Sequence, residues 1–288
     1  MKKPEDVAVI HLVRLGNKLE AFEDFLNSYR AHPAGTSHRL VILLKGFEKG
    51  IPTEVASLLN TVPHTRILCP DYGYDIGSYY YATERVRNSI LLFMNSYSVI
   101  LGHEWLSKML AAFNMPKVKL VGASGSWQSK STSCYYQALA PSSSALEYGI
   151  AKLRIGVSTI PRLALFPRFP NMHLRTNAFM IQREQFLLAR PLLMRSKVNA
   201  YLFESGYNSL TRRVAKRGGE VVVVGRNGAV YWPEQWANSG TFWQGDQENL
   251  LIQDNQTKNY HDGGAELRRH RQWCAWNCKF RWDGLNPG

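Results

Sequence analysis

Apolar runs of strand length alternate with amphipathic segments from Val7 to Val121, and this alternation limits the folds open to the chain. Five such runs predict strands, at 7–13, 38–47, 66–70, 89–95 and 119–124. The four segments between them, at 17–32, 51–62, 77–88 and 103–113, predict helices. Apolar strands separated by helices are typical of a parallel sheet covered on both faces. We therefore predict an α/β fold, Rossmann-like, with a mostly parallel sheet flanked by helices.

The chain has 288 residues, of which 45% are hydrophobic, enough for one large α/β domain or two small ones. Its beginning, MKKPEDVAVIHLVRL, is too short and too polar in its apolar part for a signal peptide. No run approaches the roughly 20 apolar residues of a membrane span. We expect a cytoplasmic protein.

The net charge of +13 and the pI of about 9.6 imply an acidic partner. Nucleic acid, a phosphate-bearing substrate and an anionic membrane all fit this charge. The cations are spread along the chain and form no nucleic-acid-binding motif, which disfavours nucleic acid. The four cysteines include one C-x3-C pair in WCAWNC and no second pair, so free thiols in a reducing compartment are favoured over zinc.

Sheets of this kind bind ligands beyond the carboxyl ends of their strands. Four polar segments follow predicted strands there: 12–16, 45–50, 70–77 and 95–98. The first is not a GxGxxG turn, and no GxxxxGK[ST] occurs, which argues against a dehydrogenase and a P-loop NTPase.

The pattern changes after Ser126. Residues 127–145 are rich in Ser, Gln and Tyr and predict a loop or flap. The run NMHLRTNAFMIQREQFL (171–187) predicts a strand entering a helix, and FESGYNSLTRRVAKRGGEVVVVG (203–225) a helix, a glycine stop and a strand. NGAVYW (227–232) predicts a short strand.

These segments resemble the inverting, family 2 type of GT-A glycosyltransferases. ILLFMNSYSVILGHEWLSKML is similar to the segment where a strand ends in a short acidic motif, and PDYGYDIGSY to a stretch of rhamnan-type polysaccharide glycosyltransferases. RTNAFMIQREQF is similar to the acceptor-side strand and helix, and FESGYNSLTRRVAKRGG to the segment that carries the catalytic base. The resemblance covers about residues 7–232. It implies a GT-A domain at 1–232, with a nucleotide-binding half at 1–126, an acceptor half at 127–232 and a C-terminal extension at 233–288 that packs on the same domain.

What the resemblance implies is transfer of a hexosyl or deoxyhexosyl group from a UDP- or dTDP-linked sugar to a saccharide or lipid-linked saccharide. Glu204 is the expected general base, placed at the mouth of a helix from about Asn208, where the helix dipole keeps a carboxylate ionised. The alternative is a charge that only stabilises that helix. A non-catalytic saccharide- or nucleotide-binding module and a nucleic-acid binder are the competing functions.

One departure from the family concerns the metal. The family has Asp-x-Asp at the strand end, and this chain has Asn95-Ser96-Tyr97-Ser98, whose neutral oxygens bind Mg²⁺ or Mn²⁺ weakly. Either no metal is used, or Lys and Arg replace it, or Asp71 and Asp75 supply carboxylates. We expect activity to survive EDTA.

Further candidates come from the same edge. Expected donor contacts are Arg14, Lys45, Asp71, Asp75, Asn95, Ser96 and Ser98; expected acceptor contacts are Arg175, Thr176 and Asn177. Solvated cations, turn and cap chemistry and a polar strand end are the competing interpretations.

The run DNQTKNYHD (254–262) predicts a loop folding back over the donor, with Asp254, Asn255 and His261 as candidates and His261 reaching a phosphate or a metal. An exposed turn between helices is its alternative. The segments 150–169 and 268–282 interleave cations with apolar residues and suit an anionic leaflet, which would place the protein at the inner membrane face. Core-facing helices with solvated arginines are the alternative there.

Overall fold

The computed structural model describes residues 6–132 and 162–276, and it confirms the predicted α/β class with a mostly parallel sheet flanked by helices. An eight-stranded sheet has the order β11-β10-β6-β9-β4-β1-β2-β3, in which β9 and β11 are antiparallel to the others. The strands are β1 (Val7–Arg14), β2 (Arg39–Lys45), β3 (Thr65–Cys69), β4 (Ile90–Met94), β6 (Val118–Gly122), β9 (Ala178–Gln182), β10 (Glu220–Val224) and β11 (Val230–Tyr231). Two small ladders pair β5 (Val99–Ile100) with β12 (Ile252–Gln253) and β7 (Gly125–Ser126) with β8 (His173–Leu174).

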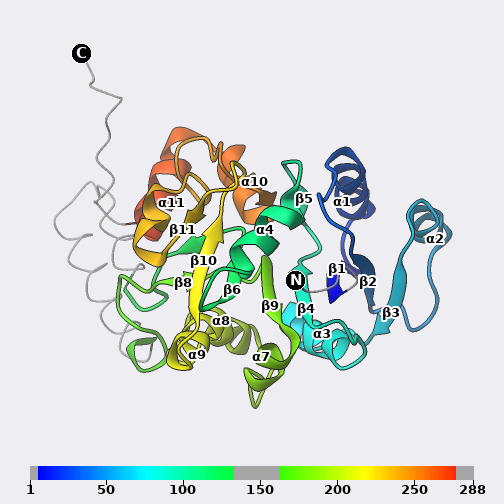
Figure 1. Ribbon diagram of the computed structural model, residues 1–288, viewed down its shortest axis with the longest axis horizontal. Helices are drawn as coiled ribbons and strands as arrows, with labels where there is room; N and C mark the ends of the chain where they lie inside the picture. Colours follow the sequence, from blue (N-terminus) through cyan, green and yellow to red (C-terminus); the bar gives the residue numbers. More distant parts are fainter. Residues whose placement is uncertain (1–5, 133–161, 277–288) are drawn as a thin grey trace, which may run out of the picture.

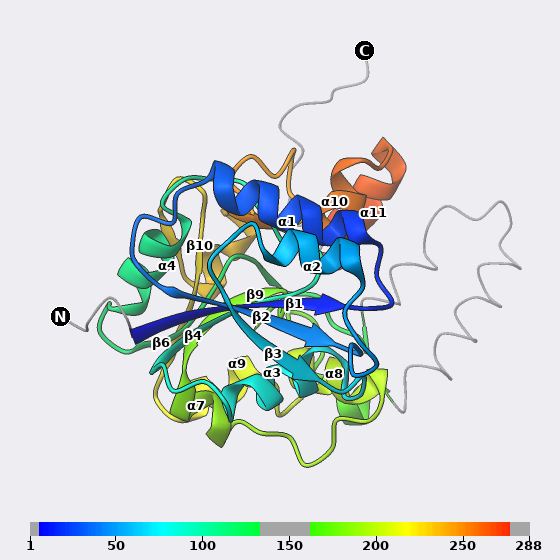
Figure 2. The ribbon, with the colours of Figure 1, turned by 90° about the vertical axis from the view of Figure 1, so that its right-hand side faces the viewer.

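Helices cover both faces of the sheet (Figure 1). One face carries α1 (Leu19–Ala31), α2 (Thr53–Leu59) and α4 (Trp105–Phe113). The other carries α3 (Tyr74–Thr83), α7 (Arg183–Leu188), α8 (Lys197–Ser205) and α9 (Leu210–Lys216). A 3-10 helix η2 (Pro233–Asn238) and the helices α10 (Asn255–His261) and α11 (Ala265–Trp276) follow β11. In Figure 2 the arrows of β1, β2 and β3 point to one edge of the sheet, on the side of the molecule where α8, α10 and α11 lie.

Strand alternation divides the core into two layers. In β1, Ala8, Ile10 and Leu12 face the α3 side, and Val9 and Val13 face the α1 side. Both sets are buried, which explains why β1 has no exposed position before Arg14.

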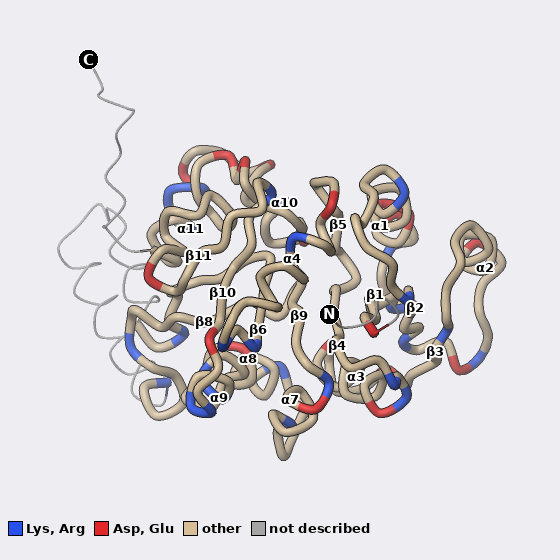
Figure 3. The backbone as a smooth tube through the Cα atoms, in the orientation of Figure 1, with Lys and Arg blue, Asp and Glu red and all other residues tan. Residues whose placement is uncertain are grey.

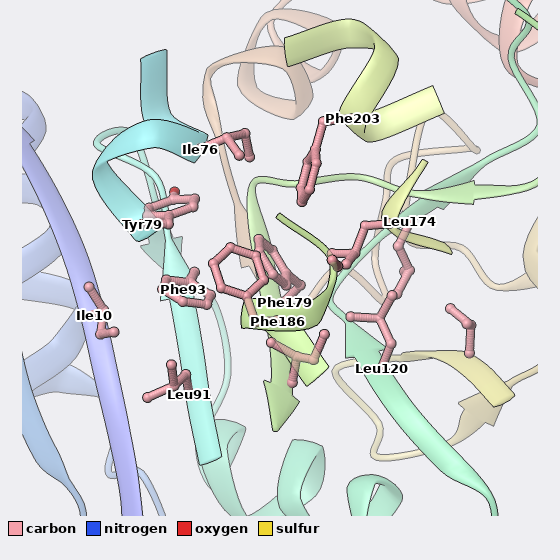
Figure 4. Packing of buried hydrophobic residues seen from close by; sticks show 14 of the residues in the cluster. Ile10, Ile76, Tyr79, Leu91, Phe93, Leu120, Leu174, Phe179, Phe186 and Phe203 are labelled. Carbon is pink, nitrogen blue, oxygen red and sulfur yellow. The ribbon is translucent and has the colours of Figure 1, made fainter. Parts of the chain in front are cut away.

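An aromatic cluster fills the layer beneath α3, α7 and α8 (Figure 4). The ring of Phe93 on β4 lies 4.7 Å from that of Tyr79, 4.7 Å from that of Phe186 and 5.1 Å from that of Phe179, between centroids. All four side chains are fully buried. Offset aromatic packing of this kind holds α3 and α7 at fixed positions above the strand that ends at Asn95.

Two predicted elements differ from the structure. Residues 203–225 do not begin with one helix, because α8 ends at Ser205, Gly206 is extended, and Ser209 caps a separate helix, α9, by accepting from the Arg212 N–H. Residues 254–262 are not a loop: Asp254 caps α10 and accepts from the Thr257 N–H at 2.9 Å.

Part of the segment after residue 232 belongs to the main core. Trp236 and Trp276 are fully buried and belong to the same hydrophobic cluster as Ile10 and Phe93. Trp276 donates its indole N–H to the Phe242 carbonyl at 2.9 Å. The boundary predicted at residue 232 stays a prediction.

Several predictions fall wholly or partly outside the described residues. The flap at 127–145 is described only to residue 132, the segment 150–169 only from residue 162, and the basic tail only to residue 276. Cys69 and Cys274 are free and buried, as predicted, whereas Cys134 and Cys278 lie outside the described residues. Within residues 6–132 and 162–276, none of the helices has the length and hydropathy needed to cross a membrane.

A buried histidine interrupts the apolar pattern of β1. The ring of His11 stacks on Phe25 with 3.5 Å between centroids and an angle of 3° between planes. Among the described residues neither ring nitrogen has a hydrogen-bond partner, and burial lowers the pKa of His11 from 6.5 to about 3. Because the unfolded chain binds a proton at His11 that the folded chain excludes, the free energy of unfolding falls as pH drops below 6.5.

We predict that His11→Leu raises the free energy of unfolding, by about 1–3 kcal/mol, because two unpartnered buried nitrogens are removed. The gain should grow between pH 6.5 and pH 4, where the unfolded wild-type chain binds a proton that the folded chain excludes. Urea unfolding of both proteins at several pH values measures it. A variant that is less stable than wild type at every pH would contradict the prediction.

Candidate functional site

A cavity lined mainly by charged groups opens where β1, β2 and β3 end. Its volume is about 550 Å³. We call it the cationic cavity, and its lining residues are Arg14, Lys45, Asp71, Tyr72, Gly73, Tyr74, Asp75 and Arg195. Four of these were predicted as donor contacts, so the structure brings Arg14, Lys45, Asp71 and Asp75 together as the strand ends required.

Asp71 joins the ends of β1 and β3. Its carboxylate accepts from Arg14 Nε at 3.1 Å and from Arg14 Nη2 at 3.0 Å, a two-pronged contact. This hydrogen bonding lowers the pKa of Asp71 and raises that of Arg14. Both side chains are more than 40% exposed, so the pair contributes order to the loop rather than much stability.

Lys45 is not the solvated cation that one interpretation allowed. Its residue is 2% exposed, and Nζ donates to the Tyr74 carbonyl oxygen at 2.7 Å and lies 3.8 Å from Asp71 Oδ1. Burial lowers the pKa of Lys45, against the opposing effect of Asp75 and Asp71. The contact holds Gly73 and Tyr74, which both have positive φ (73° and 53°) at the start of α3.

Asp75 is the carboxylate of the cationic cavity that has no hydrogen bond from the described residues. It lies half-buried in the first turn of α3. Burial raises its pKa, Lys45 and Arg14 oppose this, and Glu204 adds to it.

The tetrapeptide at the end of β4 folds on itself. Asn95 Oδ1 accepts from the Tyr97 N–H and from Ser98 Oγ, each at 3.1 Å, and Ser98 is fully buried. Ser96 Oγ accepts from Asn17 Nδ2 at 2.7 Å. Ser98 therefore shapes the turn. Its buried hydroxyl donates to Asn95 and does not reach a bound sugar nucleotide while this hydrogen bond is made.

The antiparallel strand β9 brings the residues just before it, which were predicted as acceptor contacts, to this turn. The Asn95 N–H donates to the Asn177 carbonyl at 2.8 Å, and Ser124 Oγ donates to Asn177 Oδ1 at 3.1 Å. Asn177 Nδ2 is buried and has no hydrogen-bond partner within residues 6–132 and 162–276. Asn177 thus lies between the ends of β4 and β6 rather than on an outer strand end.

Arg175 reaches the C-terminal segment. Its Nη2 donates to Asp254 Oδ2 at 2.6 Å, its Nη1 donates to Ser124 Oγ at 3.2 Å, and its guanidinium lies 4.2 Å from the centre of the Phe242 ring. The Arg175 side chain is 10% exposed and that of Asp254 is 1% exposed. Arg175, a predicted acceptor contact, and Asp254, a candidate of the C-terminal segment, therefore form one buried ion pair. The carboxylate of Asp254 binds Arg175 and not a ligand.

Glu204 lies in the last turn of α8, and its predicted place at a helix N-terminus is wrong. The dipole at a helix C-terminus disfavours a carboxylate, so it cannot supply the predicted stabilisation. The backbone N–H of Thr176 donates to Glu204 Oε1 at 3.1 Å instead. Among the described residues, Oε2 has no hydrogen-bond donor, and the side chain is half-buried.

A second cavity, of about 260 Å³, surrounds this carboxylate, and we call it the Glu204 cavity. It is lined by Ser126, Gln128, Lys130, His173, Arg175, Tyr201, Glu204, Phe242, Trp243, Gln256 and Arg271. His173 Nδ1 lies 2.7 Å from the Asn171 carbonyl, so Nδ1 carries the proton and Nε2 a lone pair. Burial is the main cause that lowers the pKa of His173, which keeps the ring neutral at pH 7.

The remaining C-terminal candidates do not line either cavity. Asn255 and His261 are exposed on α10, and His261 lies in its last turn, away from the Asp254 cap. Sequence reasoning missed Arg195, Lys130, Gln256 and Arg271, because none of them follows a strand that the sequence predicts. Asn17 carried a signal: it follows β1 by three residues, in the same loop as Arg14.

The described residues do not fit a divalent metal. Within residues 6–132 and 162–276, no group of three or more His, Cys, Asp or Glu side chains could hold one. Asn95 Oδ1 is already engaged, Asp71 is paired with Arg14, and Asp75 lies beside Lys45. Cations next to the two carboxylates favour an anionic ligand over Mg²⁺ or Mn²⁺.

Comparison with known proteins gives distant matches of fold only. No protein-family model matches the chain, and no curated protein matches it. Among solved structures, it is similar to the mannosyltransferase PcManGT from Pyrobaculum calidifontis in complex with GDP-Man and Mn²⁺, with a TM-score of 0.47 and 12% identity over 94% of this chain and 72% of that one.

Two further structures are similar over a smaller part of the chain. Glucosyl-3-phosphoglycerate synthase from Mycobacterium tuberculosis, in complex with Mn²⁺, UDP and phosphoglyceric acid, has a TM-score of 0.45 and 12% identity over 76% of this chain and 67% of that one. The 4-diphosphocytidyl-2C-methyl-D-erythritol synthase from Anaerococcus prevotii has a TM-score of 0.42 and 11% identity, over 77% and 89%. Likeness at this level carries no argument about activity.

We predict that Arg175→Met lowers the free energy of unfolding by about 3–5 kcal/mol, because it leaves the Asp254 carboxylate buried without its partner. Lys258→Met is the control, since Lys258 and Asp262 form an exposed pair within one helix and its loss should change stability very little. Chemical denaturation of both variants compares them. Equal stability of the two variants would contradict the prediction.

Proposed function

We propose that the protein is an inverting glycosyltransferase that moves a sugar from a nucleotide-sugar donor to a saccharide or lipid-linked saccharide. The observation that supports it is the arrangement of two polar cavities along one edge of the sheet. One holds three cations and two carboxylates, and the other holds three cations around a half-buried carboxylate with one oxygen free of donors among the described residues. A transfer reaction with an anionic leaving group needs both.

In this proposal the cationic cavity takes the diphosphate of a UDP- or dTDP-linked donor. Arg14 and Arg195 present guanidinium groups, which grip phosphate oxygens well, and Lys45 adds a buried ammonium. Asp75, which has a raised pKa and no hydrogen bond from the described residues, is placed to contact sugar or ribose hydroxyls. Asn95 and Ser96, at the end of β4, are buried and do not line this cavity.

Glu204 would then act as the general base. It accepts the proton of the acceptor hydroxyl, whose oxygen forms a bond to the anomeric carbon. The bond from that carbon to the diphosphate breaks, and the electron pair leaves with the diphosphate, whose charge the three cations stabilise. Thr176 orients the base through its N–H, and Arg175 fixes the adjoining strand end through Asp254.

A non-catalytic binding module of the same fold is the second candidate. The feature that favours it is the predicted position of Asp-x-Asp, which Asn95 and Ser96 occupy in a self-contained turn. It would bind nucleotide-sugars without releasing nucleoside diphosphate. A nucleic-acid binder would instead bind oligonucleotides with a steep dependence on salt.

We predict that Glu204→Gln lowers donor turnover by about 100- to 10,000-fold, because the acceptor proton loses its base. Thermal shift against a panel of UDP-, dTDP- and GDP-sugars identifies the donor, and released nucleoside diphosphate measures turnover. Donor binding should be unchanged in the variant. Glu234→Gln, at an exposed position in η2, is the matched control and should retain full activity.

The possible results separate the candidate functions. Donor binding without turnover in the wild type would support the binding module, and oligonucleotide binding without nucleotide-sugar binding would support the third function. Wild-type turnover in the Glu204→Gln variant would exclude Glu204 as the base while leaving the transferase proposal standing.

We also predict that turnover survives EDTA. The cations of the cationic cavity would neutralise the leaving diphosphate, and the described residues offer no three-ligand carboxylate or imidazole set. The assay compares turnover with and without EDTA, and then with added Mn²⁺. Complete loss in EDTA, restored by Mn²⁺, would show that this account of the cavity is wrong.

A further inference from the structure

The segment that joins α7 to α8 presents large apolar side chains to solvent. Leu192 is fully exposed, Leu188 and Leu193 are 60% and 59% exposed, and Val198 at the start of α8 is 48% exposed. In both Figure 1 and Figure 2 this segment forms the lower edge of the molecule. Contiguous exposed apolar residues mark interaction surfaces more often than isolated ones do.

Behind these leucines lies an apolar groove of about 320 Å³. Its apolar walls come from Leu165, Pro191, Leu192, Leu193, Leu202 and Phe203. Phe203 belongs to the aromatic core, so the groove floor is continuous with the packed interior. We call the exposed leucines and this groove together the α7–α8 surface.

Cations accompany the α7–α8 surface. From Leu187 to Arg217 the chain has seven Lys and Arg residues and one acid, Glu204. Glu204 lies in its own cavity, and Arg190 pairs with Glu84. Lys197 has no acidic partner within 4.0 Å among the described residues, whereas Arg195 lines the cationic cavity. Figure 3 shows blue positions recurring along α9 and this lower edge.

The backbone of the surface is held in place rather than left to collapse. Arg213 Nη1 donates to the Ala189 and Arg190 carbonyls at 3.2 and 3.3 Å, and Arg217 Nη2 donates to the Leu188 carbonyl at 3.1 Å. Ser196 and Asn199 form a capping box at the start of α8. The exposed leucines are therefore presented by an ordered support.

We propose that the α7–α8 surface docks on an anionic lipid bilayer, with Leu192 and Leu193 inserted among the acyl chains and the surrounding cations at the headgroups. Apolar side chains ringed by Lys and Arg have the composition that such an interface favours. A second copy of this chain is disfavoured as the occupant, because its cations would face the same cations. The proposal is independent of the reaction proposed above.

The test is flotation of the full chain with vesicles of phosphatidylcholine mixed with phosphatidylglycerol, and with vesicles of phosphatidylcholine alone. We expect binding to the anionic vesicles that weakens with salt. Leu192→Ser combined with Leu193→Ser should lower the partition coefficient by about tenfold or more, because two exposed leucines no longer enter the apolar layer. Lys197→Glu should lower it by about fivefold or more.

Matched controls lie outside this surface. Leu68→Ser combined with Met115→Ser removes two other exposed apolar residues, and Lys18→Glu makes the same charge change at the start of α1, on the other face of the sheet. Both should bind as wild type does. The proposal is overturned if wild type fails to bind anionic vesicles, or if the double leucine variant binds them as tightly as its control does.

Discussion

A single strand that runs against its neighbours decides where this molecule can hold a ligand. β9 lies between β4 and β6 and is antiparallel to both, so its first residues meet the last residues of those strands. Main-chain hydrogen bonds from Asn95 to Asn177 and from Ala123 to Ala178 fix the meeting point at 2.8 and 3.1 Å. Without this reversal, Arg175 and Thr176 would lie at the opposite edge, far from Lys45. The part of the site around Arg175, Thr176 and Asn177 depends on this reversal, whereas the cationic cavity follows from the parallel strands β1, β2 and β3.

Buried and half-buried charges then order the loops around that point. Lys45 loses solvent and gains the Tyr74 carbonyl, which holds two consecutive residues of positive φ before α3. Arg175 and Asp254 pair across 79 positions of sequence, which ties α10 to the first residues before β9. Burying each charge costs desolvation free energy, which the contact offsets only when its geometry is good. These contacts therefore specify the arrangement of the loops more than they add stability.

The strands and helices before residue 126 could be predicted from sequence because their patterns are local. Apolar runs of five to eight residues are typical of a parallel sheet whose strands are buried on both faces. The direction of the strands then places the ligand-binding edge at their carboxyl ends. For this reason Arg14, Lys45, Asp71 and Asp75 could be placed together before any coordinates were known.

The remainder depends on contacts that no local pattern records. The helix predicted from about Asn208 is present as α9, but Glu204 lies in the last turn of α8, a helix that the sequence pattern did not predict. The ion pair of Arg175 with Asp254 joins distant segments, and its partner choice needs the fold. α10 was readable in principle: Asp254 is followed three residues later by Thr257, a cap signal hidden in a polar stretch.

α8 has a further meaning through its length. Its first turn adjoins the exposed leucines, and its last turn carries Glu204. Nine residues of helix span about 13 Å, and a packed helix does not stretch. If the lower edge rests on lipid and Glu204 accepts the proton, the length of α8 limits the distance between the headgroups and the reacting hydroxyl. Acceptors that cannot place a hydroxyl at that distance from the membrane would be excluded before any contact with the site discriminates among them.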